Sequence, residues 1–78
     1  MFMTFEKELI KKNYVTFPSL NSIFTYCCPY DKTSQVNLIK ENNIYKFSFP
    51  IGDIHYATYF KDKQELKKYM NFVLVNKL

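Results

Sequence analysis

One short segment constrains the fold of this chain more than any other. In it, Tyr45, Phe47 and Phe49 alternate with Lys46 and Ser48. A period of two is typical of a β-strand that buries one face and turns the other to water. We therefore expect a sheet with one face covered by other parts of the chain.

Two similar runs flank this strand and predict the rest of the sheet. They are Gln35–Lys40 and Ile54–Phe60, on either side of Ile44–Phe49. The connections, Glu41–Asn43 and Pro50–Asp53, contain residues that favour turns. Three short runs joined in this way predict a three-stranded antiparallel sheet.

The C-terminal part of the chain predicts an amphipathic helix. Asp62 offers an acceptor to the first turn, and Glu65 follows in a pattern similar to a capping box. Apolar residues then repeat with helical spacing at Leu66, Tyr69, Met70, Val73 and Leu74. We expect this helix to pack across the sheet.

The first part of the chain predicts one or two further helices. Thr4 precedes a segment with acidic residues at its start and lysines at its end, the order that a helix dipole favours. Residues 19–28 fit a helical spacing but are also rich in strand formers. We favour a short helix from Ser19 to Tyr26, with a strand as the alternative, followed by a loop over Tyr30–Ser34.

Together these elements predict a single α+β domain over residues 1–78. With 47% hydrophobic and 23% charged residues, the composition is that of a globular protein. A chain of this length buries only about 60% of its unfolded surface, so each buried side chain must contribute much. The eight phenylalanines and seven tyrosines supply large areas for such a core.

The positive charge of the chain comes from lysine alone. All eleven basic residues are lysines, and the formal net charge is +4. Arginine holds guanine edges and phosphates with a planar fork, whereas lysine is a mobile point charge. The chain is therefore basic but lacks the side chain that most often reads base sequence.

The sequence predicts no catalytic site, no metal site and no cofactor. Cys27 and Cys28 are adjacent, and His55 is the single histidine, so the usual ligand sets of zinc are incomplete. A nucleophilic pair of either cysteine with His55 lacks a recognisable third group. The single glycine, Gly52, excludes a glycine-rich phosphate loop.

Two apolar residues fall outside the buried stripe of the C-terminal helix. Phe72 and Val75 widen its apolar surface beyond what one sheet covers, which predicts contact with a second protein chain or a homodimer through this helix. We expect the same interface to include the exposed sheet residues Lys46, His55 and Tyr59.

Our leading functional hypothesis is a non-enzymatic binding protein. The composition fits a gene rich in A and T, as in some bacteria, their phages and other mobile elements. We therefore expect an inhibitor or modulator, encoded by a phage-like element, of a host protein that handles nucleic acids. The chain shows no secretory leader and no long apolar stretch, so we expect it in the host cytoplasm and not in a membrane.

Direct binding of DNA or RNA is the first alternative. Lysines gather around the predicted sheet and the start of the last helix, with tyrosines between them, as in surfaces that hold phosphates and stack bases. The residues concerned are Lys46, Lys61, Lys63, Lys67, Lys68, Tyr45 and Tyr56. This alternative predicts an affinity that falls steeply with salt.

A resemblance to a known family supports this alternative. The segments Ile44–Phe49, His55–Phe60 and Lys61–Tyr69 resemble the AP2-like DNA-binding domain at the N-terminus of phage and transposon integrases. The resemblance covers residues 36–75 and implies a three-stranded sheet that lies in the major groove.

At the junction between strand and helix, Phe60, Lys61, Lys63 and Glu65 sit at the positions that match the family's motif. The family's sheet is rich in arginine, whereas this chain has lysine and serine there, and we expect no integrase catalytic domain after it.

Two other possibilities remain open at this point. In a winged-helix arrangement, Ser34–Asn42 would be the recognition helix and Ile44–Phe60 the wing. The β-branched and polar residues of this stretch favour strands over such a helix. A structural or assembly protein of a virion is the third functional class.

Overall fold

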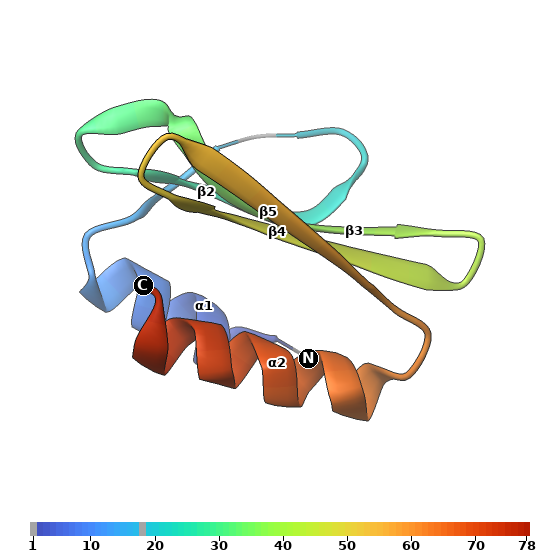
Figure 1. The fold of residues 1–78 in the computed structure, drawn as a ribbon. Helices are drawn as coiled ribbons and strands as arrows, with labels where there is room; N and C mark the ends of the chain where they lie inside the picture. Colours follow the sequence, from blue (N-terminus) through green and yellow to red (C-terminus); the bar gives the residue numbers. More distant parts are fainter. Residues whose placement is uncertain (1, 18) are drawn as a thin grey trace.

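The computed structural model describes residues 2–17 and 19–78, with the main chain alone at residues 32 and 33. One layer is an antiparallel sheet, and the other consists of helices α1 (Met3–Lys11) and α2 (Lys63–Asn76). Both helices cover the same face of the sheet and run side by side (Figure 1). The predicted α+β class is thus confirmed.

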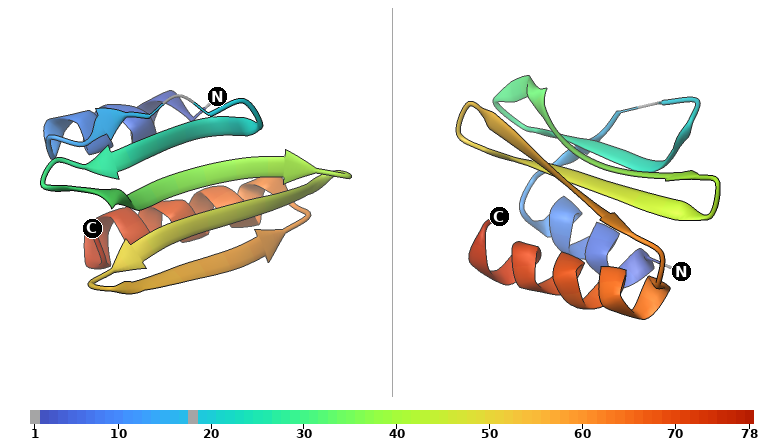
Figure 2. Two further views of the ribbon diagram at one scale, coloured as in Figure 1. Left: turned by 90° about the horizontal axis from the view of Figure 1, so that it is seen from above. Right: turned by 45° about the vertical axis from the view of Figure 1, so that its right-hand side comes forward.

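The sheet is larger than the sequence predicted. Its strands are β1 (Val15–Thr16), β2 (Ser22–Cys28), β3 (Asp31–Glu41), β4 (Ile44–Ile51) and β5 (Ile54–Phe60). Each strand pairs with the next one along the chain, so the described residues form a five-stranded meander (Figure 2). The prediction of three strands therefore missed β1 and β2.

The predicted helix from Ser19 to Tyr26 is wrong. This part of the chain contains β2, which pairs with β3 and turns Phe24 and Tyr26 toward the helices. Strand propensity depends on what a strand packs against, and here the neighbouring β3 and the aromatic core provide that partner. The alternative prediction, a strand in residues 19–28, is correct.

The predicted loop and the winged-helix arrangement also fail. The turn after β2 ends at Tyr30, and β3 begins at Asp31 and runs to Glu41. Most of the supposed loop Tyr30–Ser34 is therefore strand, and Ser34–Asn42 cannot be a recognition helix. The backbone amides of this stretch gain a partner on each side, β2 and β4, which a surface helix would not provide.

Two tight turns fix the register of β3, β4 and β5. Asn42 and Asn43 have positive φ angles of 51° and 65°, which a two-residue type I′ turn requires. Gly52 has a φ of 60° at the first central position of the next turn, where Ile51 pairs with Ile54. Because both turns contain two residues, alternate side chains remain on the same face along all three strands.

The two helices begin differently. Asp62 caps α2 as predicted, because its side chain accepts a hydrogen bond of 3.0 Å from the main-chain N–H of Gln64. By contrast, Thr4 lies inside α1 and does not cap it, since the helix begins at Met3 after Phe2.

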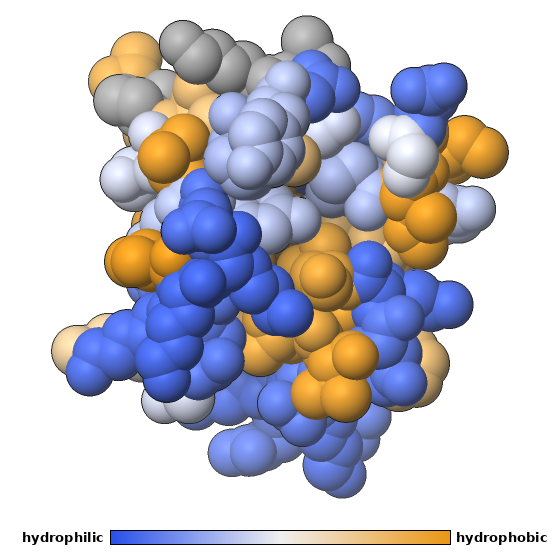
Figure 3. All heavy atoms as spheres, turned by 90° about the vertical axis from the view of Figure 1, so that its left-hand side faces the viewer, coloured by the Kyte–Doolittle hydropathy of each residue, from blue (hydrophilic) through white to orange (hydrophobic). Residues whose placement is uncertain are grey.

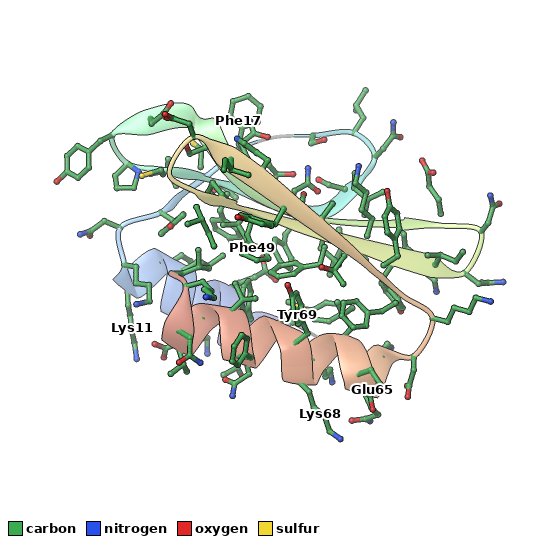
Figure 4. The ribbon with its side chains drawn as sticks, in the orientation of Figure 1. Lys11, Phe17, Phe49, Glu65, Lys68 and Tyr69 are labelled. Atoms are coloured by element: carbon green, nitrogen blue, oxygen red, sulfur yellow. The ribbon has the colours of Figure 1, made fainter. Side chains whose placement is uncertain are left out.

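The core lies between the two layers and is mainly aromatic. Phe47, at the centre of β4, packs against Phe5 of α1, its strand neighbour Phe49 and Tyr69 of α2. Phe49 and Tyr69 both lie in the space between the sheet and α2 (Figure 4). The remaining buried apolar residues include Phe24, Val36, Leu38, Leu66, Met70, Val73 and Leu74.

Candidate protein interface

The sheet has a second face, which points away from the helices and which we call the outer face. The pairing register places alternate residues of every strand on it. From β2 to β5 these residues are Thr25, Cys27, Gln35, Asn37, Ile39, Glu41, Ile44, Lys46, Ser48, Pro50, His55, Ala57 and Tyr59.

Small and polar side chains form the central row of the outer face. Thr25 pairs with Asn37, Asn37 with Ser48, and Ser48 with Ala57. At the end of this row the main-chain N–H of Phe17 donates a 2.9 Å hydrogen bond to Thr25, and the Phe17 ring lies on the same face (Figure 4). No helix among the described residues covers this row.

A hollow lies on the outer face near the turn between β3 and β4. It has a volume of about 300 Å³ and is lined by Ile39, Glu41, Asn42, Ile44, Lys46 and Tyr59. Tyr59 is 64% exposed and pairs directly with Lys46 across β4 and β5. An exposed tyrosine beside isoleucine side chains and one ammonium group suits a single apolar or acidic side chain of a partner.

The outer face carries little charge. Between residues 35 and 60, Lys46 and Glu41 are its charged side chains, and His55 is its one further titratable group apart from Tyr59. One positive and one negative charge give no net attraction for phosphates. Interface cores between proteins are likewise depleted in charge and enriched in tyrosine.

The predicted interface residues divide between the two layers. Lys46, His55 and Tyr59 all lie on the outer face. Phe72 and Val75 belong to α2 in the other layer and are exposed, as the sequence indicated. The structure therefore brings three of these five residues to one surface and leaves two on another.

Phe72 and Val75 also have different neighbours on α2. Phe72 is 52% exposed and stacks on Tyr69, with ring centres 6.5 Å apart. Val75 instead lines a groove of about 570 Å³ between the helices, together with residues such as Phe5 and Leu74. Phe72 thus extends the aromatic cluster beside β5, and Val75 does not.

The end of the molecule that carries the C-terminus also has apolar side chains at its surface. Figure 3 shows them between strongly hydrophilic residues. Ile51 and Ile54, which flank the turn between β4 and β5, are both exposed. Apolar surface is therefore exposed at this turn as well as on the outer face.

The predicted nucleic-acid residues do not gather on one face. Tyr45 is only 6% exposed, so its ring is not available to stack on a base. Tyr56 stacks on Phe49 on the helix side of the sheet. Lys46 is on the outer face, whereas Lys61, Lys63, Lys67 and Lys68 surround the start of α2.

Among the lysines of α2, Lys68 points away from the sheet (Figure 4). Lys68 lies 3.9 Å from the carboxylate of Glu65, and both side chains are largely exposed (Figure 4). Exposed pairs of this kind contribute little to stability. On the outer face, Lys46 is the one lysine among residues 35–60.

The cysteines and the histidine lie far apart. Cys27 is on β2 and His55 is on β5, with β3 and β4 between them. Within residues 2–17 and 19–78, no three His, Cys, Asp or Glu side chains gather closely enough to hold a metal ion. The same ranges contain no helix with the length and apolar character to cross a bilayer.

Tyr26 links α1 to the sheet and has a perturbed pKa. Its hydroxyl donates a 2.8 Å hydrogen bond to the carboxylate of Glu6. Burial, together with the hydrogen bond to the Glu6 carboxylate, raises the pKa of Tyr26 to about 12. Burial also raises the pKa of Tyr14. Both effects belong to the folded scaffold, away from the outer face.

Sequence reasoning missed the hollow because it did not assign Ile39 and Ile44 to either face of the predicted sheet. Ile39 pairs with Lys46 across the type I′ turn, and Ile44 lies two residues before Lys46 on β4, so all three side chains share one face. The turn residues Asn42 and Asn43 were the sequence signal for this arrangement.

No protein-family model, curated protein or solved structure matches the chain.

Proposed function

We propose that this chain is a small non-enzymatic binding protein, which inhibits or modulates a host protein that handles nucleic acids. The partner binds the outer face, over β4 and β5. The composition, typical of a mobile element rich in A and T, supports a host target of this class.

The exposure of Tyr59 at the rim of the outer-face hollow carries this proposal. A tyrosine that is 64% exposed on a regular strand costs the fold nothing to remove, and it offers a large rigid surface to a partner. Tyrosine is among the residues that contribute most at protein interfaces. The hollow beside it, with Ile39 and Ile44 in its lining, accommodates an apolar anchor from that partner.

The charges at the hollow orient the partner. Lys46 is half-buried beside Tyr59, so its ammonium group pairs with an acidic side chain at a site partly shielded from water. Glu41 also lines the hollow and disfavours a second acidic group there. This combination selects a protein surface with mixed charge over a polyanion.

The test is quantitative capture of a partner from host extract by tagged protein. Tyr59→Ala should reduce capture at least tenfold and leave the melting temperature unchanged. Tyr30→Ala is the matched control, because Tyr30 is also exposed, at 95%, but lies in the turn between β2 and β3. Equal capture by the wild type and Tyr59→Ala would contradict the proposal.

A separate mobility-shift experiment tests nucleic-acid binding. Purified protein is mixed with duplex and single-stranded DNA and RNA at low salt. We expect no retarded complex, because Lys46 lies on the outer face of the sheet and the lysines of α2 belong to the other layer. A complex that is lost with rising salt and with Lys61→Gln, Lys63→Gln and Lys67→Gln would establish the alternative instead.

A further inference from the structure

The two edges of the sheet are protected to different degrees. At one edge, β1 is only two residues long, and short edge strands resist pairing with other chains. At the other edge, β5 has seven residues and contains no lysine and no proline. Its pairing with β4 runs without a bulge, and β4 is its one neighbour among the described residues.

The turn that precedes β5 determines which of its backbone groups are free. In a two-residue turn, the closing residues, here Ile51 and Ile54, exchange both hydrogen bonds, and bonded pairs then alternate along the ladder. Tyr56, Thr58 and Phe60 therefore bond to β4. His55, Ala57 and Tyr59 direct their N–H and C=O groups to the open edge.

This free edge is complementary to itself. If two copies of β5 pair in antiparallel fashion about Ala57, the two Ala57 residues face each other and each His55 faces the Tyr59 of the other copy. No like charges meet, and the small alanine lies at the centre of the pairing, where each Ala57 faces its own copy. All three edge-facing residues then exchange their main-chain hydrogen bonds.

The side chains on the helix side of β5 are compatible with antiparallel pairing of two β5 strands. Figure 2 shows β5 as the outermost strand, extending beyond α2. Tyr56, on the helix side of β5, is 44% exposed. Thr58 donates a 3.3 Å hydrogen bond to Tyr69, so the Tyr69–Phe72 stack lies beside β5 on its helix side. A second copy paired there brings its own Tyr56 and Phe72 to this exposed aromatic surface.

We propose that two copies of this chain associate through β5, in antiparallel pairing about Ala57, to form one continuous sheet. The dimer joins two outer faces into a single surface with two copies of Tyr59. It does not depend on the proposed function, because it forms with purified protein alone.

Sedimentation equilibrium of the purified protein tests the dimer. The wild type should reach twice the monomer mass as its concentration rises. Ala57→Glu places two carboxylates opposite each other and should remain monomeric with an unchanged far-UV spectrum, since Ala57 is exposed in the single chain. A wild type that is monomeric up to millimolar concentration overturns the proposal, whether or not the edge accepts a strand from another protein.

A second measurement separates pairing at β5 from a dimer held by α2 alone. Residues that face each other in a bonded pair have Cα atoms about 5.5 Å apart, within the range of a disulfide. Ala57→Cys should therefore form a covalent dimer on mild oxidation, and Tyr30→Cys, an equally accessible thiol elsewhere, should not.

Hydrogen exchange gives the independent readout. The amides of His55, Ala57 and Tyr59 should become protected as the protein concentration rises, at least tenfold between the monomer and the dimer. Association without this protection, or equal cross-linking of Ala57→Cys and Tyr30→Cys, overturns pairing at β5 and leaves contact through α2 as the explanation.

Discussion

The two faces of the sheet use the same strands for different purposes. The face toward the helices carries Phe24, Leu38 and Phe47, which are buried in a single aromatic and aliphatic core. The outer face carries short polar side chains in its central row and an exposed tyrosine beside a hollow. One face therefore determines the fold, and the other is free to bind.

This difference teaches where substitutions should act. Side chains of the core lose contacts on every side when they are shortened, whereas an exposed side chain loses few. Stability and binding should therefore respond to different residues of the same strand. Measurements of stability and of partner binding on single variants should separate these two effects.

Phe47→Ala should have the largest effect on stability. Phe47 is fully buried and contacts aromatic rings from α1, β4 and α2, so its removal leaves a cavity between the layers. We expect the free energy of unfolding to fall by about 3 to 5 kcal/mol, which unfolds much of a domain this small. Urea denaturation measures this change, and Tyr59→Ala, expected within about 0.5 kcal/mol of the wild type, is the contrast.

Tyr26→Phe should have an intermediate effect that depends on pH. At neutral pH it removes the hydrogen bond to Glu6 and should cost about 1 to 3 kcal/mol, because the acceptor is charged.

The sign of the pH dependence follows from the raised pKa. The folded protein holds the Tyr26 proton up to about pH 12, whereas the unfolded chain releases it near its ordinary value of 10. The stabilisation is complete below pH 10 and is lost as the pH rises toward 12. The difference in unfolding free energy between the wild type and Tyr26→Phe should shrink over this range. A constant difference would show that the hydroxyl does not titrate as described.

Asn37→Val should act in the opposite direction and stabilise the protein. The side-chain oxygen of Asn37 is buried on the outer face with no hydrogen-bond partner among the described residues. An unpaired buried polar atom costs about 1 to 3 kcal/mol, and valine is the better strand former. Thermal denaturation should show a higher melting temperature, and a lower one would mean that the amide is satisfied in solution.

The sequence was sufficient for the parts of the fold that local patterns determine. The alternation around Phe47, the Asn42–Asn43 turn and the cap at Asp62 each depend on neighbouring residues, and each lies where it was expected. The pattern of β2 was ambiguous on its own. Only its pairing with β3 and the contact of Phe24 with Phe5 decide that it is a strand.

The candidate interface could be predicted in part for the same reason. Lys46, His55 and Tyr59 occupy alternating positions on two strands that a short turn joins, so the sequence predicts that they share one face. The helical spacing of Phe72 does not show how far it lies from that face, because the sequence does not determine which side of the sheet a helix covers. Tyr45 failed as a candidate because it shares the buried face of β4 with Phe47 and Phe49.

The most direct test of the account compares capture of the host partner by variants of the two layers. Tyr59→Ala changes the outer face, and the double variant Lys67→Gln and Lys68→Gln changes the exposed side of α2. We predict that Tyr59→Ala loses the partner and that the double variant retains it at the wild-type level, with both proteins folded. Retention by Tyr59→Ala and loss by the double variant would show that the helical layer, and not the outer face, is the binding surface.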